Sequence, residues 1–226
     1  MAGGSGSRVS KILTKPKCLV EVNGFALIDW QIQWLKLQGV SRLIIAIGHQ
    51  SELIYEHFRW RRPALPISFS YESQPLGTGG AVVNALNNGN VSGDFCVING
   101  DTLISGNLQD MVVFHGATQA LCTIGYVPAS RGDAQDYGGI TLNEDSRVLD
   151  FSEKSGENSF VSTGVCVFST EAFRTVKLGF LSLERDIIPA ISAQRRCYAY
   201  QFRNFYDIGT VDRLHKILQG ECTWEE

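Results

Sequence analysis

The chain has 226 residues, of which 44% are apolar and 19% are charged, and its formal net charge at pH 7 is −3. This balance is ordinary for a globular protein and excludes a disordered or fibrous chain. No stripe of Lys or Arg suits a polyanion, so nucleic acid is not an expected partner. No stretch reaches the roughly 20 apolar residues of a membrane helix, and the first residues lack the apolar core of a secretory signal. We therefore expect a cytoplasmic protein with no membrane partner.

The cysteines and histidines do not form a reactive pattern. The six cysteines fall at irregular intervals without a C-x-x-C pair, and the four histidines are scattered. We therefore expect reduced thiols in apolar strands, no zinc site and no covalent catalysis through a Ser-His-Asp or Cys-His arrangement.

Up to about residue 100, short apolar runs alternate with amphipathic stretches, a pattern typical of βαβ units in a mainly parallel sheet. The helical spacing of apolar residues distinguishes the amphipathic stretches from the strands. The pattern predicts strands over 42–47, 67–71 and 95–98, and helices over 27–37, 51–58 and 82–86.

After residue 101 the pattern becomes richer in β-strands, with a helix first and two helices late. It predicts helices over 108–115, 182–191 and 211–218, and strands over 120–127, 138–142, 148–151 and 160–168. No internal repeat or low-complexity linker divides the chain. We expect one α/β domain over 1–226, a Rossmann-like, mainly parallel mixed sheet flanked by helices. Residues 1–100 would form a nucleotide-binding half, and 101–226 a metal- and sugar-binding half.

The opening segment Ala2-Gly3-Gly4-Ser5-Gly6-Ser7-Arg8 places three glycines within four positions. Such a loop allows close backbone approach to a triphosphate, and Arg8 and Lys17 supply positive charge for it. It lacks the G-K-[ST] ending of a P-loop and the spacing of G-x-G-x-x-G. A flexible Gly-Ser leader or a fusion scar explains the segment equally well.

Asp101 directly follows an apolar strand and a glycine. Its carboxylate should project from the carboxyl edge of the sheet, where ligands of open α/β folds bind. Taken alone, a turn-forming Asp is the simpler interpretation. Asp207, between Tyr206 and Ile208, is a second candidate carboxylate, and it could equally cap the helix that follows.

Eight short segments, in this order, resemble the sugar-1-phosphate nucleotidyltransferase family over nearly the whole chain. They are GGSGSR, Pro16-Lys17, PLGTGGA at 75–81, Asn99-Gly100-Asp101, Tyr137-Gly138, the 151–154 run FSEK, Ser162-Thr163-Gly164 and Tyr206-Asp207-Ile208-Gly209. The PKC, PLGTGGA and SLERD stretches are also similar to guanylyltransferases acting on D-glycero-D-manno-heptose 1-phosphate. Mannose-1-phosphate guanylyltransferases and glucose-1-phosphate thymidylyltransferases share most of these motifs.

The resemblance implies an enzyme that transfers a nucleoside monophosphate from an NTP to a sugar 1-phosphate and releases pyrophosphate, with Mg²⁺ as cofactor. It implies catalytic roles for Arg8, Lys17 and Asp101, and metal ligation by Asp101 and Asp207. The nucleotide-binding residues implied are Ala2, Gly3, Gly4, Gly6, Ser7, Arg8, Lys17, Glu72, Pro75, Gly77, Thr78, Gly79, Asn99 and Asp101. Those implied for the sugar phosphate are Gly138, Glu153, Lys154, Thr163 and Gly164.

The resemblance implies that the segment from Glu72 to Ala81 binds the nucleotide base, and Glu72 indicates which base it is. A carboxylate can accept from both the N1–H and the exocyclic amine of guanine, whereas uracil and thymine offer one ring N–H between two carbonyls. This favours GTP. A solvated loop carboxylate, with uridylyl or thymidylyl specificity, remains the alternative.

The chain departs from the family pattern at its start, because no apolar strand precedes the glycine loop. We expect the first strand to be missing; one hypothesis is that Met1 is an internal methionine, with the true start upstream. A second departure is Ser162, where many members carry Asn.

A catalytically weak or inactive sugar-nucleotide-binding regulatory subunit is the alternative function. A glycosyltransferase ranks last, because Asn99-Gly100-Asp101-Thr102 lacks a D-x-D motif. Homo-oligomer formation is left open.

Overall fold

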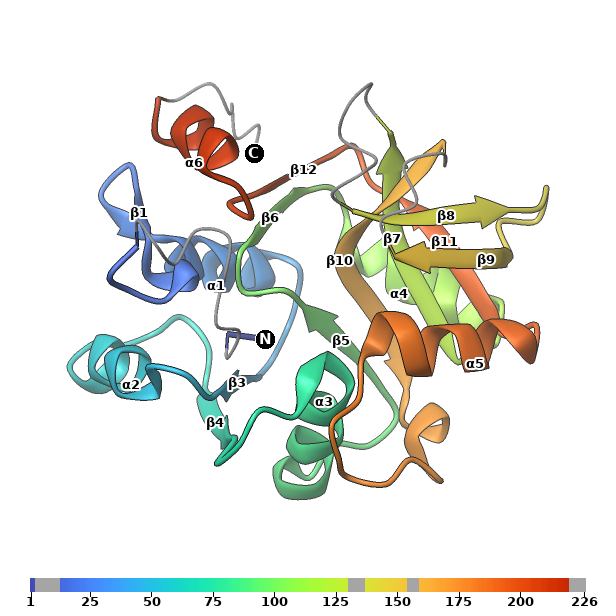
Figure 1. Ribbon diagram of the computed structural model, residues 1–226, viewed down its shortest axis with the longest axis horizontal. Coiled ribbons are helices and arrows are strands. Elements are labelled where there is room, and N and C mark those ends of the chain that lie inside the picture. Colours follow the sequence, from blue (N-terminus) through green and yellow to red (C-terminus); the bar gives the residue numbers. More distant parts are fainter. Residues whose placement is uncertain (3–12, 130–136, 154–158, 220–226) are drawn as a thin grey trace. The chain divides into compact units, whose positions relative to one another are not determined.

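The computed structural model describes residues 1–2, 13–129, 137–153 and 159–219 (Figure 1). Its internal contacts divide the chain into two compact units, which are described separately. Unit 1 comprises Met1–Pro75, Asn99–Ser105 and the chain from Phe205 onward. Unit 2 comprises Leu76–Ile98 and Gly106–Asn204. The predicted site residues Gly3, Gly4, Gly6, Ser7, Arg8 and Lys154 lie outside the described residues.

Unit 1 contains a parallel strand pair with helices between the strands and beside them. The pair is β3 (Leu43–Ile47) with β4 (Ile67–Tyr71), in register Leu43 to Ile67 through Ile47 to Tyr71. A short hairpin of β1 (Glu21–Val22) and β2 (Phe25–Ala26) precedes α1 (Leu27–Leu37). The other elements are η1 (Lys17–Leu19), α2 (Ser51–Arg59), β6 (Thr102–Ser105), which pairs with β12 (Asn204–Asp207), and α6 (Val211–Leu218).

One hydrophobic cluster in unit 1 joins segments that are far apart in sequence. Its buried members are Val20, Val22, Leu27, Leu103, Ile208, Leu214 and Ile217. Because apolar burial stabilises by about 25 cal/mol per Å², this cluster fixes β6 and the chain after β12 against α1 and α6. Asp101 and Asp207 lie within two residues of cluster members, so the cluster also places these two carboxylates.

Unit 2 is built around a mixed six-stranded sheet whose central strand is β10 (Phe160–Ser169). One edge of β10 pairs antiparallel with β7 (Cys122–Pro128), and β7 pairs parallel with β11 (Cys197–Gln201). The other edge pairs antiparallel with β5 (Asp94–Ile98) and with β8 (Gly138–Leu142), which continues to β9 (Val148–Glu153).

The helical elements of unit 2 are α3 (Gly77–Gly89), α4 (Leu108–Ala117), η2 (Thr170–Phe173), η3 (Leu183–Ile187) and α5 (Ile188–Ala193). Helix α4 contacts β7, β10 and β11, and α5 contacts β9 and β11 (Figure 1). In the described part of the chain, no helix is both long and apolar enough to cross a membrane.

The strongly patterned elements match the sequence predictions. Four elements have the same bounds in the structure as in the prediction. They are the strands 67–71 and 138–142 and the helices 27–37 and 211–218. The helix predicted over 82–86 is wrong in extent, because it begins at Gly77. The helix predicted over 182–191 begins with the π-type turn η3 and continues as α5. The strands β1, β2, β6, β11 and β12 were not predicted.

The described cysteines are unpaired thiols, as the sequence predicted. Cys122 and Cys197 lie opposite each other on β7 and β11, and both are fully buried. Burial raises the pKa of Cys18 to about 12 and that of Cys96 to about 12. Thiols with such pKa values remain protonated and unreactive near neutral pH.

His115 on α4 is a buried ionisable group in unit 2. The residue is 1% exposed, its Nδ1 lies 2.8 Å from Oγ1 of Thr123, and its Nε2 has no hydrogen-bond partner. Burial lowers the pKa of His115, and the charge of Asp94, 3.8 Å away, opposes part of this shift. The folded state therefore favours the neutral imidazole.

We expect this histidine to make the protein less stable in mild acid. In the unfolded chain its pKa is about 6.5, so the unfolded state takes up a proton first as the pH falls. The contribution is complete above about pH 6.5 and is lost as the pH falls below that value toward the folded pKa. The urea concentration at the midpoint of unfolding should be lower at pH 5.5 than at pH 7.5, and this decrease should be smaller in His115→Gln. The exposed His215→Gln is the matched control and should behave like the unsubstituted protein; equal pH dependence in all three would contradict the assignment.

Candidate functional site

Lys17 and Asp101 form an ion pair in unit 1, although 84 positions separate them in sequence. The Nζ atom of Lys17 lies 3.0 Å from Oδ2 of Asp101, and the two side chains are 21% and 28% exposed. Lys17 begins η1, directly after Pro16 in an extended conformation. Two of the three residues predicted to be catalytic are therefore adjacent, and both remain accessible to a ligand.

The Asp101 turn lies beside the carboxyl end of β3. Gly100 N donates to Met1 O at 2.8 Å, and Ala2 N donates to Ala46 O at 2.9 Å. A Cβ atom on Gly100 would lie 2.6 Å from Met1 O, so this close approach requires glycine. Glu72 N donates to Ile47 O at 2.9 Å. The predicted nucleotide-binding residues Ala2, Glu72, Asn99 and Asp101 are thus brought to one edge of the β3–β4 pair.

Gln31 of α1 was not predicted as a site residue, yet it holds the Asp101 turn. Its Nε2 donates to Asn99 O at 2.7 Å and also, by a short hydrogen bond, to Thr102 O. Gln31 is 8% exposed and lies on the apolar face of α1. A polar residue among the apolar positions of an amphipathic helix was the available signal, because a buried amide requires partners.

Asp207 is tied to the same turn through the backbone. Ile208 N donates to Asp101 O at 3.1 Å, next to the β6–β12 pairing. The Asp207 carboxylate is contacted by Nη1 of Arg213 at 3.1 and 3.3 Å and accepts from Gly209 N. Asp207 does not cap α6, because the side chain of Thr210 does so by accepting from Arg213 N. The alternative of a helix-capping Asp207 is therefore wrong.

Metal ligation by Asp101 and Asp207 stays a prediction. Each carboxylate is neutralised by a cationic side chain, Lys17 at Asp101 and Arg213 at Asp207, which shows that each attracts positive charge. Within the described residues, no group of three or more His, Cys, Asp or Glu side chains could hold a metal ion. Mg²⁺ does not need one, since it commonly takes one or two carboxylates and completes its octahedron with phosphate oxygens and waters.

The glycine-rich segment of unit 2 packs against the chain around Leu181. Gly79 N and Gly80 N both donate to Leu181 O, at 2.8 and 3.2 Å, and Cβ atoms at Gly77, Gly79 or Gly80 would clash with residues 179–187. The hydroxyl of Thr78 donates to Glu184 at 2.7 Å and accepts from Leu183 N at 2.8 Å. Packing against residues 179–187 is enough to require glycine at these positions, so base binding by Gly77, Thr78 and Gly79 stays a prediction. Pro75, another predicted nucleotide-binding residue, is exposed in unit 1.

The residues predicted for the sugar phosphate lie in the sheet of unit 2. Gly138 pairs with Glu153, and Phe151 leaves no room for a Cβ atom at Gly138. Thr163 is buried and donates to Gly125 O at 2.9 Å, so its hydroxyl is already engaged. Gly164 has a φ of +75° where the β7–β10 register shifts, a bulge of the kind often found near active sites.

Comparison with known proteins identifies the family. The sequence profile described as "Nucleotidyl transferase" matches residues 1–223. The chain belongs to this family. It is 28% identical over 220 residues to a D-glycero-alpha-D-manno-heptose 1-phosphate guanylyltransferase of Aneurinibacillus thermoaerophilus, covering 96% of this chain and 94% of that protein. It is 31% identical over 233 residues to the mannose-1-phosphate guanylyltransferase catalytic subunit beta of Danio rerio, covering 99% of this chain and 63% of that longer protein.

Solved structures agree with the fold of this nucleotidyltransferase. HddC from Yersinia pseudotuberculosis superposes with a TM-score of 0.82 at 25% identity, over 98% of this chain and 97% of that chain. A putative glucose-1-phosphate thymidylyltransferase from Bacillus anthracis gives a TM-score of 0.83 at 18% identity, over 100% and 95%, and supports the fold alone. The predicted mixed α/β nucleotidyltransferase fold and the predicted enzyme class are confirmed.

Replacement of Gln31 should destabilise the Asp101 turn. Gln31→Leu leaves the carbonyls of Asn99 and Thr102 without their donor, a loss of about 1–3 kcal/mol in the free energy of unfolding. The neighbouring Gln33→Leu, at an exposed position of the same helix, should change it by at most about 0.5 kcal/mol. Urea denaturation of the two variants measures the difference. Equal effects would show that the hydrogen bonds of Gln31 contribute nothing specific.

Replacement of Arg213 should strengthen divalent cation binding. Arg213→Gln removes a positive charge that competes for Asp207, so Mn²⁺ should bind about tenfold more tightly, as electron paramagnetic resonance of free Mn²⁺ can measure. The exposed Arg203→Gln is the matched control, and the double variant Arg213→Gln/Asp207→Asn should lose the gain. Unchanged or weaker Mn²⁺ binding in Arg213→Gln would show that Asp207 is not a ligand.

Proposed function

We propose that this chain transfers a guanylyl group from GTP to a heptose- or mannose-type sugar 1-phosphate and releases pyrophosphate. The Lys17–Asp101 ion pair, backbone-linked to Asp207, is the observation that carries the proposal. It provides a cation and two carboxylates at the carboxyl end of β3, where α/β folds bind ligands. The heptose and mannose guanylyltransferases named among the relatives support the choice of substrates.

In the proposed reaction, an oxygen of the sugar phosphate attacks the α-phosphorus of GTP in line. The bond from the α-phosphorus to the bridging oxygen breaks, and pyrophosphate leaves with the electron pair. The obstacle is the repulsion between two anions. Lys17, 3.0 Å from Asp101, is placed to exchange its carboxylate partner for a phosphate oxygen and so to reduce this repulsion.

Asp101 and Asp207 are the residues that would hold Mg²⁺. When bound, this ion supplies charge neutralisation on the phosphate oxygens and on the leaving group. Gln31 keeps Asp101 in place by its two hydrogen bonds to the flanking carbonyls. Catalysis of this kind depends on fixed charges and positioning rather than on a covalent intermediate.

Glu72 supports the choice of guanine. It follows β4 directly and is anchored through its own N–H to Ile47 O, at the same edge as Asp101. A carboxylate there offers two acceptor oxygens to the N1–H and the exocyclic amine of guanine. A GMP-PN complex has been solved for the HddC protein of Yersinia pseudotuberculosis, to which this chain is similar.

A second candidate function, a regulatory subunit that binds sugar nucleotide without turnover, is favoured by one observation. Arg213 contacts both oxygens of the Asp207 carboxylate, which is 8% exposed. A carboxylate neutralised in this way can be a structural group without a metal. Catalysis requires Arg213 to release one oxygen, whereas a binding subunit does not require it.

Pyrophosphate release distinguishes the two functions. The chain with Mg²⁺ should release pyrophosphate from GTP with D-glycero-D-manno-heptose 1-phosphate or mannose 1-phosphate, and less with ATP, UTP or dTTP. Asp101→Asn and Lys17→Met should each reduce kcat by about 100-fold or more, while Lys36→Met, at an exposed position on α1, should not. A folded sample that binds GDP-sugar but releases no pyrophosphate from any pair would overturn the catalytic proposal.

A further inference from the structure

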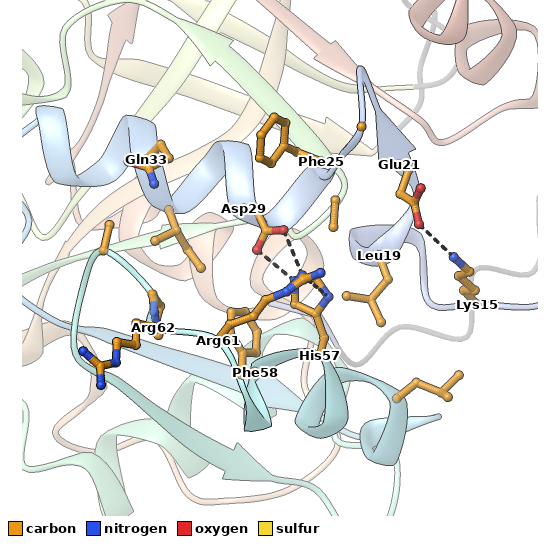
Figure 2. A pocket seen from close by; sticks show the side chains of 16 residues that line it. Lys15, Leu19, Glu21, Phe25, Asp29, Gln33, His57, Phe58, Arg61 and Arg62 are labelled. Atoms are coloured by element: carbon orange, nitrogen blue, oxygen red, sulfur yellow. Dashed lines mark hydrogen bonds and ion pairs between the residues drawn. The ribbon is translucent and has the colours of Figure 1, made fainter.

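A cavity of about 750 Å³ lies within unit 1. It is lined by the segment before α1, by α1 and α2, and by the chain over 61–64, and Figure 2 shows its side chains. Lys17, Asp101 and Asp207 do not contribute to its lining. Its volume is within the range of about 300–1,000 Å³ that is typical of small-molecule sites.

Part of the cavity lining is apolar. Leu19, Ile32 and Phe58 line it and are each less than 10% exposed. Phe25 also lines it, is 59% exposed and packs edge-on against Trp30 at 5.5 Å between ring centroids. An exposed aromatic ring beside a buried apolar surface can bind the face of a planar ligand.

One side of the cavity has an ionic network that joins Asp29 of α1 to His57 of α2 and to Arg61, which follows α2. Nε2 of His57 lies 2.8 Å from Oδ1 of Asp29, and Nη1 of Arg61 lies 3.4 Å from Oδ2 of the same carboxylate. Nη1 of Arg61 also lies 3.0 and 2.9 Å from the two ring nitrogens of His57. Figure 2 shows the three side chains converging. Among the described residues, Arg61 therefore contacts Asp29 and His57 through Nη1 alone.

The cavity is positively charged overall, in contrast to the chain as a whole. Its charged side chains are Lys15, Arg61 and Arg62 against Glu21 and Asp29. Lys15 is paired with Glu21 at 3.2 Å. Among the residues that the structure describes, Arg62 has no hydrogen-bond or ion-pair partner. An unpaired arginine beside a fixed one offers several donors to an anionic group.

We propose that this cavity is a second ligand site, which binds an organic anion with a planar, apolar body. The body packs on Leu19, Ile32, Phe58 and Phe25, and the anionic group lies at Arg61 and Arg62. The site is independent of the proposed transfer reaction, because none of its side chains is used there. Such a site would let a small anion bind the enzyme while GTP and sugar phosphate occupy the Asp101 region.

The proposal is tested with 8-anilinonaphthalene-1-sulfonate, a fluorescent anion with two aromatic rings. The complete chain should bind one molecule per chain with saturable fluorescence. Arg62→Glu should weaken binding about tenfold or more, the effect expected from losing a hydrogen-bonded charge. Arg59→Glu introduces the same charge change three positions away, at a side chain that pairs with Glu56 and does not line the cavity, and should alter binding less than twofold.

A further variant separates this site from the proposed active site. Asp101→Asn should leave binding of the probe unchanged, whether or not the chain is a transferase. Equal weakening by Arg59→Glu and Arg62→Glu would show only a general charge effect and would overturn the proposal. So would a loss of binding in Asp101→Asn, or binding that does not saturate. Circular dichroism of each variant confirms that the fluorescence does not come from unfolded protein.

Discussion

The turn at Asp101 is held by hydrogen bonds from separate parts of unit 1. Gln31 of α1 donates to the carbonyls on either side of the turn, and Ile208 N donates to Asp101 O. Gly100 N donates to Met1 O. A carboxylate held at so many backbone points loses little conformational entropy on binding a ligand, because folding has already fixed it. The hydrophobic cluster around Leu27, Leu103 and Ile208 is the packing that keeps these donors together.

The elements that could be predicted from the sequence are those with a strong local pattern. Helix α1 has apolar residues at helical spacing, and β3 is a run of Leu and Ile, so local preference and tertiary packing agree. Strands β6 and β12 have four residues each and are stabilised by pairing across about a hundred positions, which no local pattern encodes. The predicted helix 82–86 left out Gly77 and Gly79, whose contacts with the chain around Leu181 stabilise the start of α3 at Gly77. Tertiary contact outweighed the low helix propensity of glycine.

The residues of the candidate site likewise divide into those that could be predicted from the sequence and those that could not. Lys17 and Asp101 were identified because their motifs occur in the family order, and the structure pairs them. The sequence did not predict roles for Gln31, Arg213 and Glu184. Gln31 and Glu184 contact partners that are distant in sequence, and Arg213 contacts Asp207, whose own role was predicted without it. A helix cap was a reasonable local explanation of Asp207. The neighbouring Thr210 performs that role instead, which leaves the Asp207 carboxylate to Arg213.

The two carboxylates differ in how exposed their ion pairs are, and this difference sets the cost of freeing each carboxylate for a ligand. Lys17 contacts Asp101 through one nitrogen, and both side chains are more than a fifth exposed. The side chains of Arg213 and Asp207 are 16% and 9% exposed, and Asp207 has a further backbone donor. Separation of an ion pair costs more as the pair becomes less exposed to water, so the Arg213–Asp207 pair is the more costly of the two to separate. In the proposed reaction, Asp101 would therefore exchange its cationic partner for Mg²⁺ at lower cost than Asp207, which would hold the ion only once Arg213 releases a carboxylate oxygen.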